Sequence, residues 1–195
     1  MQDIVFQTLE ESIRVKERFI KENADTLLSL AQRMAGCFAS DHKLLMFGNG
    51  GSAADAQHIA AEFVNRFAVE RKPLPALALT TDTSIITSIS NDYSFDDIFS
   101  KQIEALGQKD DMALAISTSG NSRNVILAVE TARLGGLYTV GLTGGGGGEL
   151  GRCCDLALIV DSKSTPRIQE SHALAGHILC ELVERILFPE SFGGA

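Results

Sequence analysis

Apolar residues recur at helical spacing over residues 3–40 of the chain. They are Ile4, Val5, Leu9 and Ile13, followed by Leu27, Leu28, Leu30, Met34 and Phe38. The pattern is interrupted near Glu22, Asn23 and Ala24. It therefore predicts a pair of helices within residues 1–40, ahead of any strand.

Short apolar runs alternate with helical patterns over the rest of the chain. The runs lie at 43–48, 76–80, 112–117, 138–143 and 155–160, and the helical patterns at 52–67, about 83–107, 121–135 and 166–188. Because the runs are continuous, they are typical of parallel strands buried on both faces. The alternation predicts an α/β fold with a doubly wound, five-stranded parallel sheet, a flavodoxin-like three-layer sandwich. We expect one domain over residues 1–195, with the two helices leading it.

Composition narrows the possible partners and the compartment. The chain has 195 residues and a net charge of −8, which disfavours nucleic-acid binding because that affinity comes mainly from Lys and Arg. Its first residues are charged throughout, unlike a signal peptide, and no apolar run approaches the ~18 residues that span a bilayer. We therefore expect a cytoplasmic protein with no membrane partner. The four cysteines, Cys37, Cys153, Cys154 and Cys180, fit reduced thiols better than a disulfide framework.

Ligands bind beyond the carboxyl ends of the strands in doubly wound sheets. The segments assigned to those ends are 48–52, 90–94, 117–122 and 143–148. Segment 117–122 reads STSGNS and opens a helix, so its hydroxyls and free backbone N–H groups predict a cradle for a phosphate ester that needs no lysine. An ordinary helix cap made by Ser and Asn accounts equally for the same residues.

Two further segments at this edge are rich in glycine. Segment 48–52 reads GNGGS, which lets a ligand approach the backbone closely. Ala53 stands where a dinucleotide-binding fingerprint requires glycine, so we do not expect NAD. For the run Gly144–Gly148 we expect a flexible surface turn rather than a second cradle.

Histidine and carboxylate side chains lie at helical spacing in two places. His58 and Glu62 are four residues apart, so they share one face of a helix and suit either a divalent metal or an acid–base pair. A surface contact without a function is the alternative. The closing helix carries Gln169, His172 and His177, and there the alternative is a pair of half-buried histidines with satisfied hydrogen bonds.

The spacing of Gln169 and His177 restricts how they act together. Eight residues separate them, which is ~12 Å along a straight helix, whereas zinc ligand atoms lie only about 2.0–2.3 Å from the metal. Either the helix is broken between them or the two residues serve one site from different chains. We favour the second, which places the site at an oligomer interface.

The combined motifs resemble the sugar isomerase (SIS) domain family and, within it, the phosphoheptose isomerases. They are GNGGS, His58 with Glu62, SND at 90–92, STSGNS, and RIQESHALAGH at 167–177. The resemblance implies interconversion of sedoheptulose 7-phosphate and D-glycero-D-manno-heptose 7-phosphate, the first step of bacterial heptose nucleotide synthesis for the lipopolysaccharide core. It also implies one zinc ion per site and a homotetramer with sites at subunit contacts. A different divalent ion and a different phosphosugar, such as a pentose phosphate, stay open.

The resemblance also assigns roles to residues of this chain. The implied zinc ligands are His58, Glu62, Gln169 and His177, of which Glu62 and His177 also act as the acid–base pair through an enediol(ate). The implied substrate contacts are Asn49, Gly50, Gly51, Asn91, Asp92, Ser117, Thr118, Ser119 and Ser122, together with Glu62 and Gln169.

A second resemblance points to a protein that is not an enzyme. A replication-initiator-associating protein of the same fold resembles SAADAQH (52–58), ISTSGNS (116–122) and the ending LFPE (187–190). That protein lacks the acidic residue and the histidine found here at Glu62 and His177. Because a binding module does not need an acid–base pair, we expect the enzyme.

Overall fold

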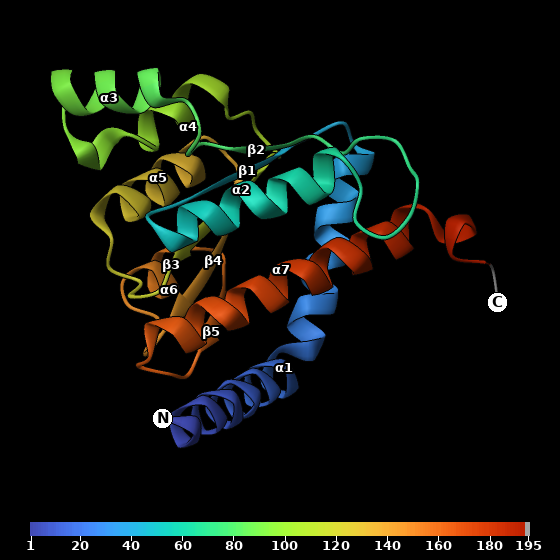
Figure 1. The fold of residues 1–195 in the computed structure, drawn as a ribbon. Coiled ribbons are helices and arrows are strands. Elements are labelled where there is room, and N and C mark those ends of the chain that lie inside the picture. Colours follow the sequence, from blue (N-terminus) through green and yellow to red (C-terminus); the bar gives the residue numbers. More distant parts are fainter. Residues whose placement is uncertain (194–195) are drawn as a thin grey trace.

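The computed structural model describes residues 1–193 and contains a single parallel sheet (Figure 1). Its strands are β1 (Leu44–Gly48), β2 (Ala76–Ala78), β3 (Met112–Ser117), β4 (Tyr138–Gly144) and β5 (Leu156–Val160). They lie in the order β2-β1-β3-β4-β5, and each neighbouring pair is parallel. This confirms the predicted doubly wound sheet.

Helices connect and flank the strands. They are α1 (Gln2–Ala39), α2 (Gly51–Val64), α3 (Thr83–Asp92), η1 (Phe95–Asp97), α4 (Ser100–Leu106), α5 (Arg123–Leu134), α6 (Leu150–Cys153), α7 (Thr165–Leu187) and η2 (Pro189–Phe192). The single helical stretch predicted near 83–107 divides into α3, η1 and α4, because Ser94 leaves the helix and accepts a hydrogen bond from the Asp96 N–H at 3.1 Å. Helices α6 and η2 were not predicted.

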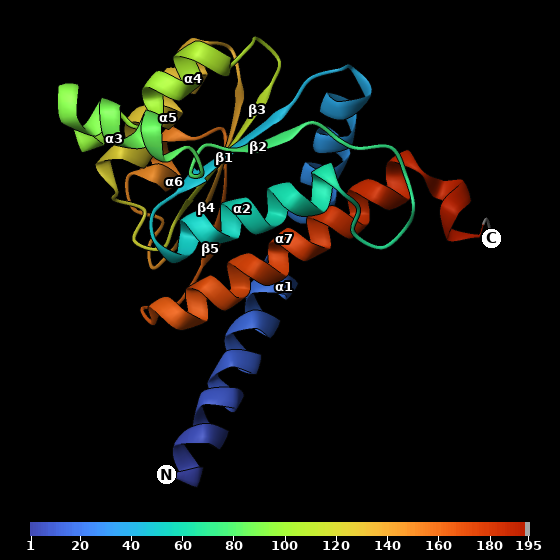
Figure 2. The same cartoon turned by 45° about the horizontal axis from the view of Figure 1, so that its top comes forward.

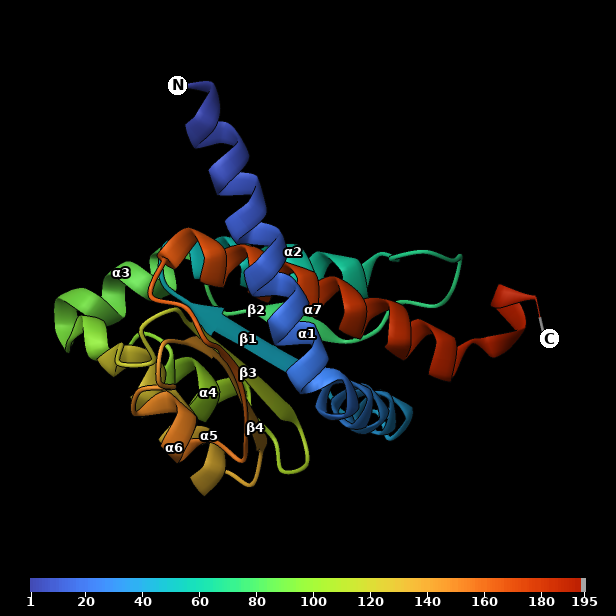
Figure 3. The ribbon, with the colours of Figure 1, turned by 90° about the horizontal axis from the view of Figure 1, so that it is seen from below.

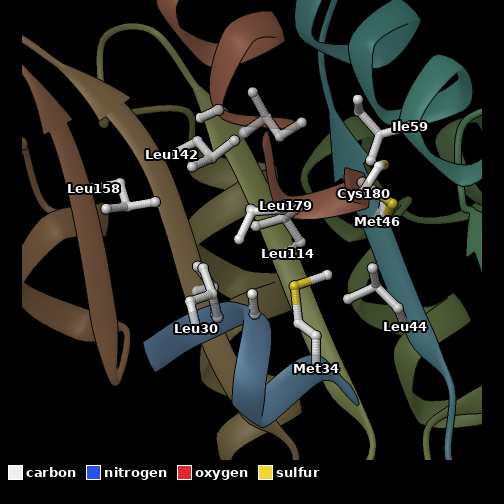
Figure 4. Close-up of a cluster of buried hydrophobic side chains, with 14 of the residues drawn as sticks. Leu30, Met34, Leu44, Met46, Ile59, Leu114, Leu142, Leu158, Leu179 and Cys180 are labelled. Atoms are coloured by element: carbon white, nitrogen blue, oxygen red, sulfur yellow. The ribbon is translucent and has the colours of Figure 1, made fainter. Parts of the chain in front are cut away.

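Alternating strand residues build a core on each face of the sheet. Leu44 and Met46 of β1 pack beneath α1, α2 and α7 (Figure 4). Leu45 and Phe47 of the same strand pack against α4, α5 and α6 on the other face. This alternation on a sheet buried on both faces confirms the three-layer sandwich and accounts for the continuous apolar runs of the strands.

The predicted pair of N-terminal helices is wrong, because α1 is one continuous element. Asn23, at the predicted interruption, donates from its side-chain amide to the Phe19 carbonyl at 2.8 Å, and neither Gly nor Pro occurs there to end the helix. The N-terminal half of α1 reaches away from the rest of the molecule (Figures 2 and 3). It carries exposed apolar side chains, namely Ile4, Val5, Phe6, Leu9 and Ile13.

The helices α2 and α7 lie side by side on one face of the sheet (Figures 1 and 2). A Cβ atom added at Gly176 of α7 would collide with the Ile59 side chain of α2, so glycine permits this close approach. Within residues 1–193, none of the helices combines the length and the apolar character that crossing a bilayer requires.

Candidate active site

The two helices α2 and α7 both begin near the carboxyl edge of the sheet. Helix α2 starts within the GNGGS segment that follows β1, and α7 starts after the short segment that follows β5. They run in the same direction (Figure 1). Residues early in α2 therefore lie beside residues early in α7, and later residues lie beside later ones. Gly51 meets Gln169 near the start of both helices, and His58 meets His177 further along. We call these the near end and the far end of the α2–α7 pair.

At the far end, two histidines and a carboxylate lie together. The Nε2 atoms of His58 and His177 are 2.8 Å apart, and their rings meet at 72°. One Nε2–H therefore donates to the other ring's nitrogen lone pair. The Glu62 Oε1 atom lies 3.7 Å from His58 Nε2, and the side chains of His58 and Glu62 are 50% and 24% exposed. His177 of α7 thus joins the predicted pair of α2 as a third titratable group. A cluster of three such groups favours a functional site over an isolated surface contact between His58 and Glu62.

At the near end, the Gln169 side chain lies directly over the backbone of Gly51. A Cβ atom at Gly51 would overlap the Gln169 amide nitrogen, so this position accepts only glycine without displacing the amide. Gly50 precedes it as the N-cap of α2, with a φ of 56° that also favours glycine. Two of the three glycines of the predicted motif are therefore favoured by local geometry.

The four predicted metal ligands divide between the two ends. Helix α7 is unbroken from Thr165 to Leu187, so the alternative of a broken helix is wrong. Gln169 meets α2 at Gly51, about 10 Å along the axis from His58, while His177 and Glu62 lie beside His58. Among residues 1–193, no group of three or more His, Cys, Asp or Glu side chains is arranged to hold a metal ion. A site shared between chains stays a prediction.

The loop 117–122 turns from β3 into α5 with its hydroxyls uncommitted to the helix. Ser122 is the N-cap of α5, yet its side chain makes no capping hydrogen bond. Its hydroxyl instead lies 3.2 Å from that of Ser117. Ser119 accepts a hydrogen bond from the Asn121 N–H at 3.2 Å and so shapes the loop. This geometry favours the predicted anion cradle over the simple cap.

The glycine run after β4 packs against this loop. Gly147 is buried with its backbone against Gly120, and the Leu150 N–H donates to the Gly120 carbonyl at 2.9 Å. Only Gly145 and Gly146 form an exposed turn, so the prediction of a surface turn is wrong for the rest of the run. The run packs this way because β3 and β4 are neighbours, which brings their carboxyl ends together.

A hollow of about 510 Å³ opens between the loop and the glycine run. Thr118 and Ser119 line it together with Gly144–Gly146, and two cationic side chains, Arg152 and Lys163, line it as well. The sequence predicts a phosphate site that needs no lysine. In the structure, Arg152 and Lys163 also line the hollow beside this loop. Arg152 follows β4 and Lys163 follows β5, so the shared sheet edge brings both cations to a loop that is remote from them in sequence.

Two residues that sequence reasoning missed support the site. Asn124 exchanges amide hydrogen bonds of 2.8 and 2.9 Å with Asn49, which ties the ends of β1 and β3 together where the strand order reverses. The signal in the sequence is that Asn124 lies four residues before Ala128, on the face of α5 that is buried. Asp55, one turn before His58, has a buried Oδ2 atom with no hydrogen-bond partner, and burial raises the pKa of its carboxyl.

Asn91 and Asp92 lie elsewhere. They were assigned to the carboxyl end of a strand, which is wrong, because they form the last turn of α3. Both are exposed, the Asn91 amide donates to the Asp92 carboxylate at 2.8 Å, and α3 buries none of its residues. Their contact with a substrate stays a prediction.

His172 lies in the core, which agrees with the alternative prediction only in part, because that prediction has two half-buried histidines with satisfied hydrogen bonds. It is almost fully buried, and its Nε2–H donates to the Thr143 carbonyl at 3.1 Å, while Nδ1 has no partner. Burial lowers the pKa of His172 to about 4, so the ring is neutral near pH 7. All four cysteines are free thiols, which confirms that prediction.

Comparison with known proteins assigns the family. The profile described as "SIS domain" matches residues 8–144. A phosphoheptose isomerase of Nitratidesulfovibrio vulgaris is 57% identical over 185 residues, which cover 95% of this chain and 89% of that protein. Two solved phosphoheptose isomerases, from Neisseria gonorrhoeae (44% identical, TM-score 0.89) and Francisella tularensis (39% identical, TM-score 0.91), match over 94% of this chain and 98% of theirs. The chain therefore belongs to the SIS domain family and, within it, to the phosphoheptose isomerases, which are enzymes.

Proposed function

We propose that the chain is an aldose–ketose isomerase that interconverts sedoheptulose 7-phosphate and D-glycero-D-manno-heptose 7-phosphate. The observation that carries the proposal is the far-end cluster, where Glu62 and His177 both approach the Nε2 atom of His58, at 3.7 and 2.8 Å. The relatives are phosphoheptose isomerases, which supports a phosphorylated heptose as the substrate. A cytoplasmic place in heptose nucleotide and lipopolysaccharide core synthesis is part of this proposal.

The reaction moves a proton between C1 and C2 through an enediol(ate), so it needs one group at carbon and one at oxygen. Glu62 takes the proton from one carbon and returns it to the other, while His177 exchanges a proton with the sugar oxygen. Loop 117–122 holds the phosphate, and Gln169 and the backbone of the Asn49–Gly51 segment at the near end contact the sugar. About 10 Å of helix separates Gly51 from His58, which suits a phosphosugar laid along the α2–α7 pair.

We also propose that zinc binds at the far end. The types of donor fit, because two imidazole nitrogens 2.8 Å apart and a carboxylate oxygen 3.7 Å from one of them are groups that zinc binds. Zinc, when bound, supplies a positive charge that polarises the sugar oxygens and stabilises negative charge on them. Glu62 keeps its second oxygen for the substrate, and His58 orients His177.

A homotetramer with sites at subunit contacts completes this proposal. Gln169 of the same chain meets α2 about 10 Å from His58, which supports the supply of Gln169 and His177 to one site from different subunits. The exposed apolar residues of the N-terminal half of α1 offer a surface for assembly. Light scattering of the purified protein tests this, and a fully active monomer would reject the shared site.

The decisive experiment incubates the purified protein with sedoheptulose 7-phosphate in D2O and follows the sugar by NMR, with and without a chelator. We expect formation of the aldose with deuterium uptake at carbon, loss of activity with chelator, and recovery with added zinc. Conversion that is insensitive to the chelator would keep the isomerase and reject zinc. Absence of conversion would reject the isomerase and favour the initiator-binding role, and ribose 5-phosphate in parallel tests the sugar length.

A further inference from the structure

The segment 65–71, between α2 and β2, is fastened to α7 by a buried ion pair. The Arg71 Nε atom lies 2.9 Å from Glu184 Oε1, and the two side chains are 1% and 0% exposed. Glu184 also accepts hydrogen bonds from the backbone N–H groups of Phe67 and Ala68, both at 2.8 Å. A buried carboxylate is thus satisfied by an arginine and by the backbone of the same segment, which we call the strap.

The other end of the Arg71 guanidinium holds the last turn of α2. One terminal nitrogen donates to the Glu62 carbonyl at 2.8 Å, and the other donates to the Phe63 carbonyl at 2.7 Å and the Asn65 carbonyl at 3.1 Å. These are carbonyls at the end of the helix, which lack partners within it. Arg71 therefore fixes the backbone of the residue that we propose as the base at carbon.

The strap also reaches the second acid–base residue. The Phe67 ring lies against the His177 imidazole, with ring centroids 5.5 Å apart and planes inclined at 32°. His58 meets the same imidazole edge-on, with centroids 5.1 Å apart. His177 therefore contacts a ring from the strap and a ring from α2, and its orientation depends on both.

We infer that the strap, through Arg71, Glu184 and Phe67, is a positioning device that aligns Glu62 and His177 for proton transfer. The inference rests on the proposed function for the roles of those two residues. Neither the two strap residues nor Glu184 of α7 needs to touch the substrate. A misplacement of about 1 Å at a distance from the reacting atoms can lower a rate by up to about 10²-fold, so the strap acts on kcat rather than on KM.

The test compares Phe67→Leu with a matched control, Phe99→Leu. Phe99 packs on Phe47 with centroids 5.4 Å apart, in the core on the opposite face of the sheet. We expect Phe67→Leu to lower kcat about tenfold with KM unchanged, by loss of alignment at His177. We also expect it to move the His177 ring signals in NMR of histidine-labelled protein, assigned with His177→Gln. Phe99→Leu lowers Tm but leaves kcat and those signals in place.

Arg71→Lys provides the second variant. It keeps the charge opposite Glu184 but loses the planar set of donors that reaches the Glu62 and Phe63 carbonyls, so kcat falls while the folded protein keeps its KM. Wild-type kcat in both strap variants, or a loss of activity matched by Phe99→Leu, would overturn the inference. An inactive wild-type protein would instead reject the proposed function and the positioning role with it.

Discussion

The near and far ends of the α2–α7 pair offer a ligand different chemistry on the same two helices. The near end presents glycine backbone and the Gln169 amide, and beside it lie the hydroxyls of loop 117–122 with the cations Arg152 and Lys163. The far end presents two imidazoles and a carboxylate. The difference teaches that recognition and proton transfer are separated along the helices. Changes at the near end are then expected to act on KM, and changes at the far end on kcat.

Glu62→Gln at the far end is expected to give the largest effect. A general acid or base contributes about 10²–10⁴ in rate, so kcat falls by that factor while KM stays within its normal range. Tm stays unchanged, because the Glu62 side chain is partly exposed and its carboxylate approaches His58 no closer than 3.7 Å. Steady-state kinetics and thermal unfolding measure both quantities, and His177→Ala should behave alike.

The control is Glu181→Gln, which removes an exposed carboxylate of α7 that is paired with Arg185 at 2.8 Å. It should leave kcat and KM at their wild-type values. Near-normal turnover in Glu62→Gln would show that Glu62 takes no part in proton transfer, and would contradict the separate roles of the two ends.

Acid should destabilise the fold through His172, which lies buried in α7 one turn after Gln169 of the near end. Its pKa is lowered by burial from 6.5 to about 4. Between pH 6.5 and about 4, His172 is therefore protonated in the unfolded chain and neutral in the folded chain. The free energy of unfolding should fall by about 3 kcal/mol as the pH drops from above 6.5 to about 4. Urea unfolding measured across that range gives the slope.

The matched variant is His172→Gln, whose amide still donates to the Thr143 carbonyl but does not titrate. Its unfolding free energy should depend less on pH than that of the wild type, while both retain the response of their carboxylates. Equal slopes in the two proteins would show that His172 is accessible to protons when folded.

The sheet could be predicted well from the sequence, because strands buried on both faces leave continuous apolar runs between turn residues. All five strands lie within two residues of those runs. Helix boundaries were harder. Helix α1 continues past Asn23, where neither Gly nor Pro ends it, although the apolar pattern is interrupted there. The pairing of His58 with His177 depends on how closely α2 approaches α7 at Gly176. The spacing of residues along a single helix does not give the distance between two helices.

Ser122→Ala at the near end is expected to give the smallest effect and the sharpest test of the separation. A hydroxyl that donates to a charged phosphate is worth about 1.5 kcal/mol or more, so KM should rise about tenfold with kcat little changed. Because the Ser122 side chain does not cap α5, alanine costs the helix nothing and Tm should hold. Ser119→Ala differs, since its hydroxyl accepts from the Asn121 N–H and shapes the loop, so it should also lower Tm. A fall in kcat as large as the rise in KM for Ser122→Ala would mean that the phosphate end takes part in the chemical step, because binding energy realised only in the transition state appears in kcat.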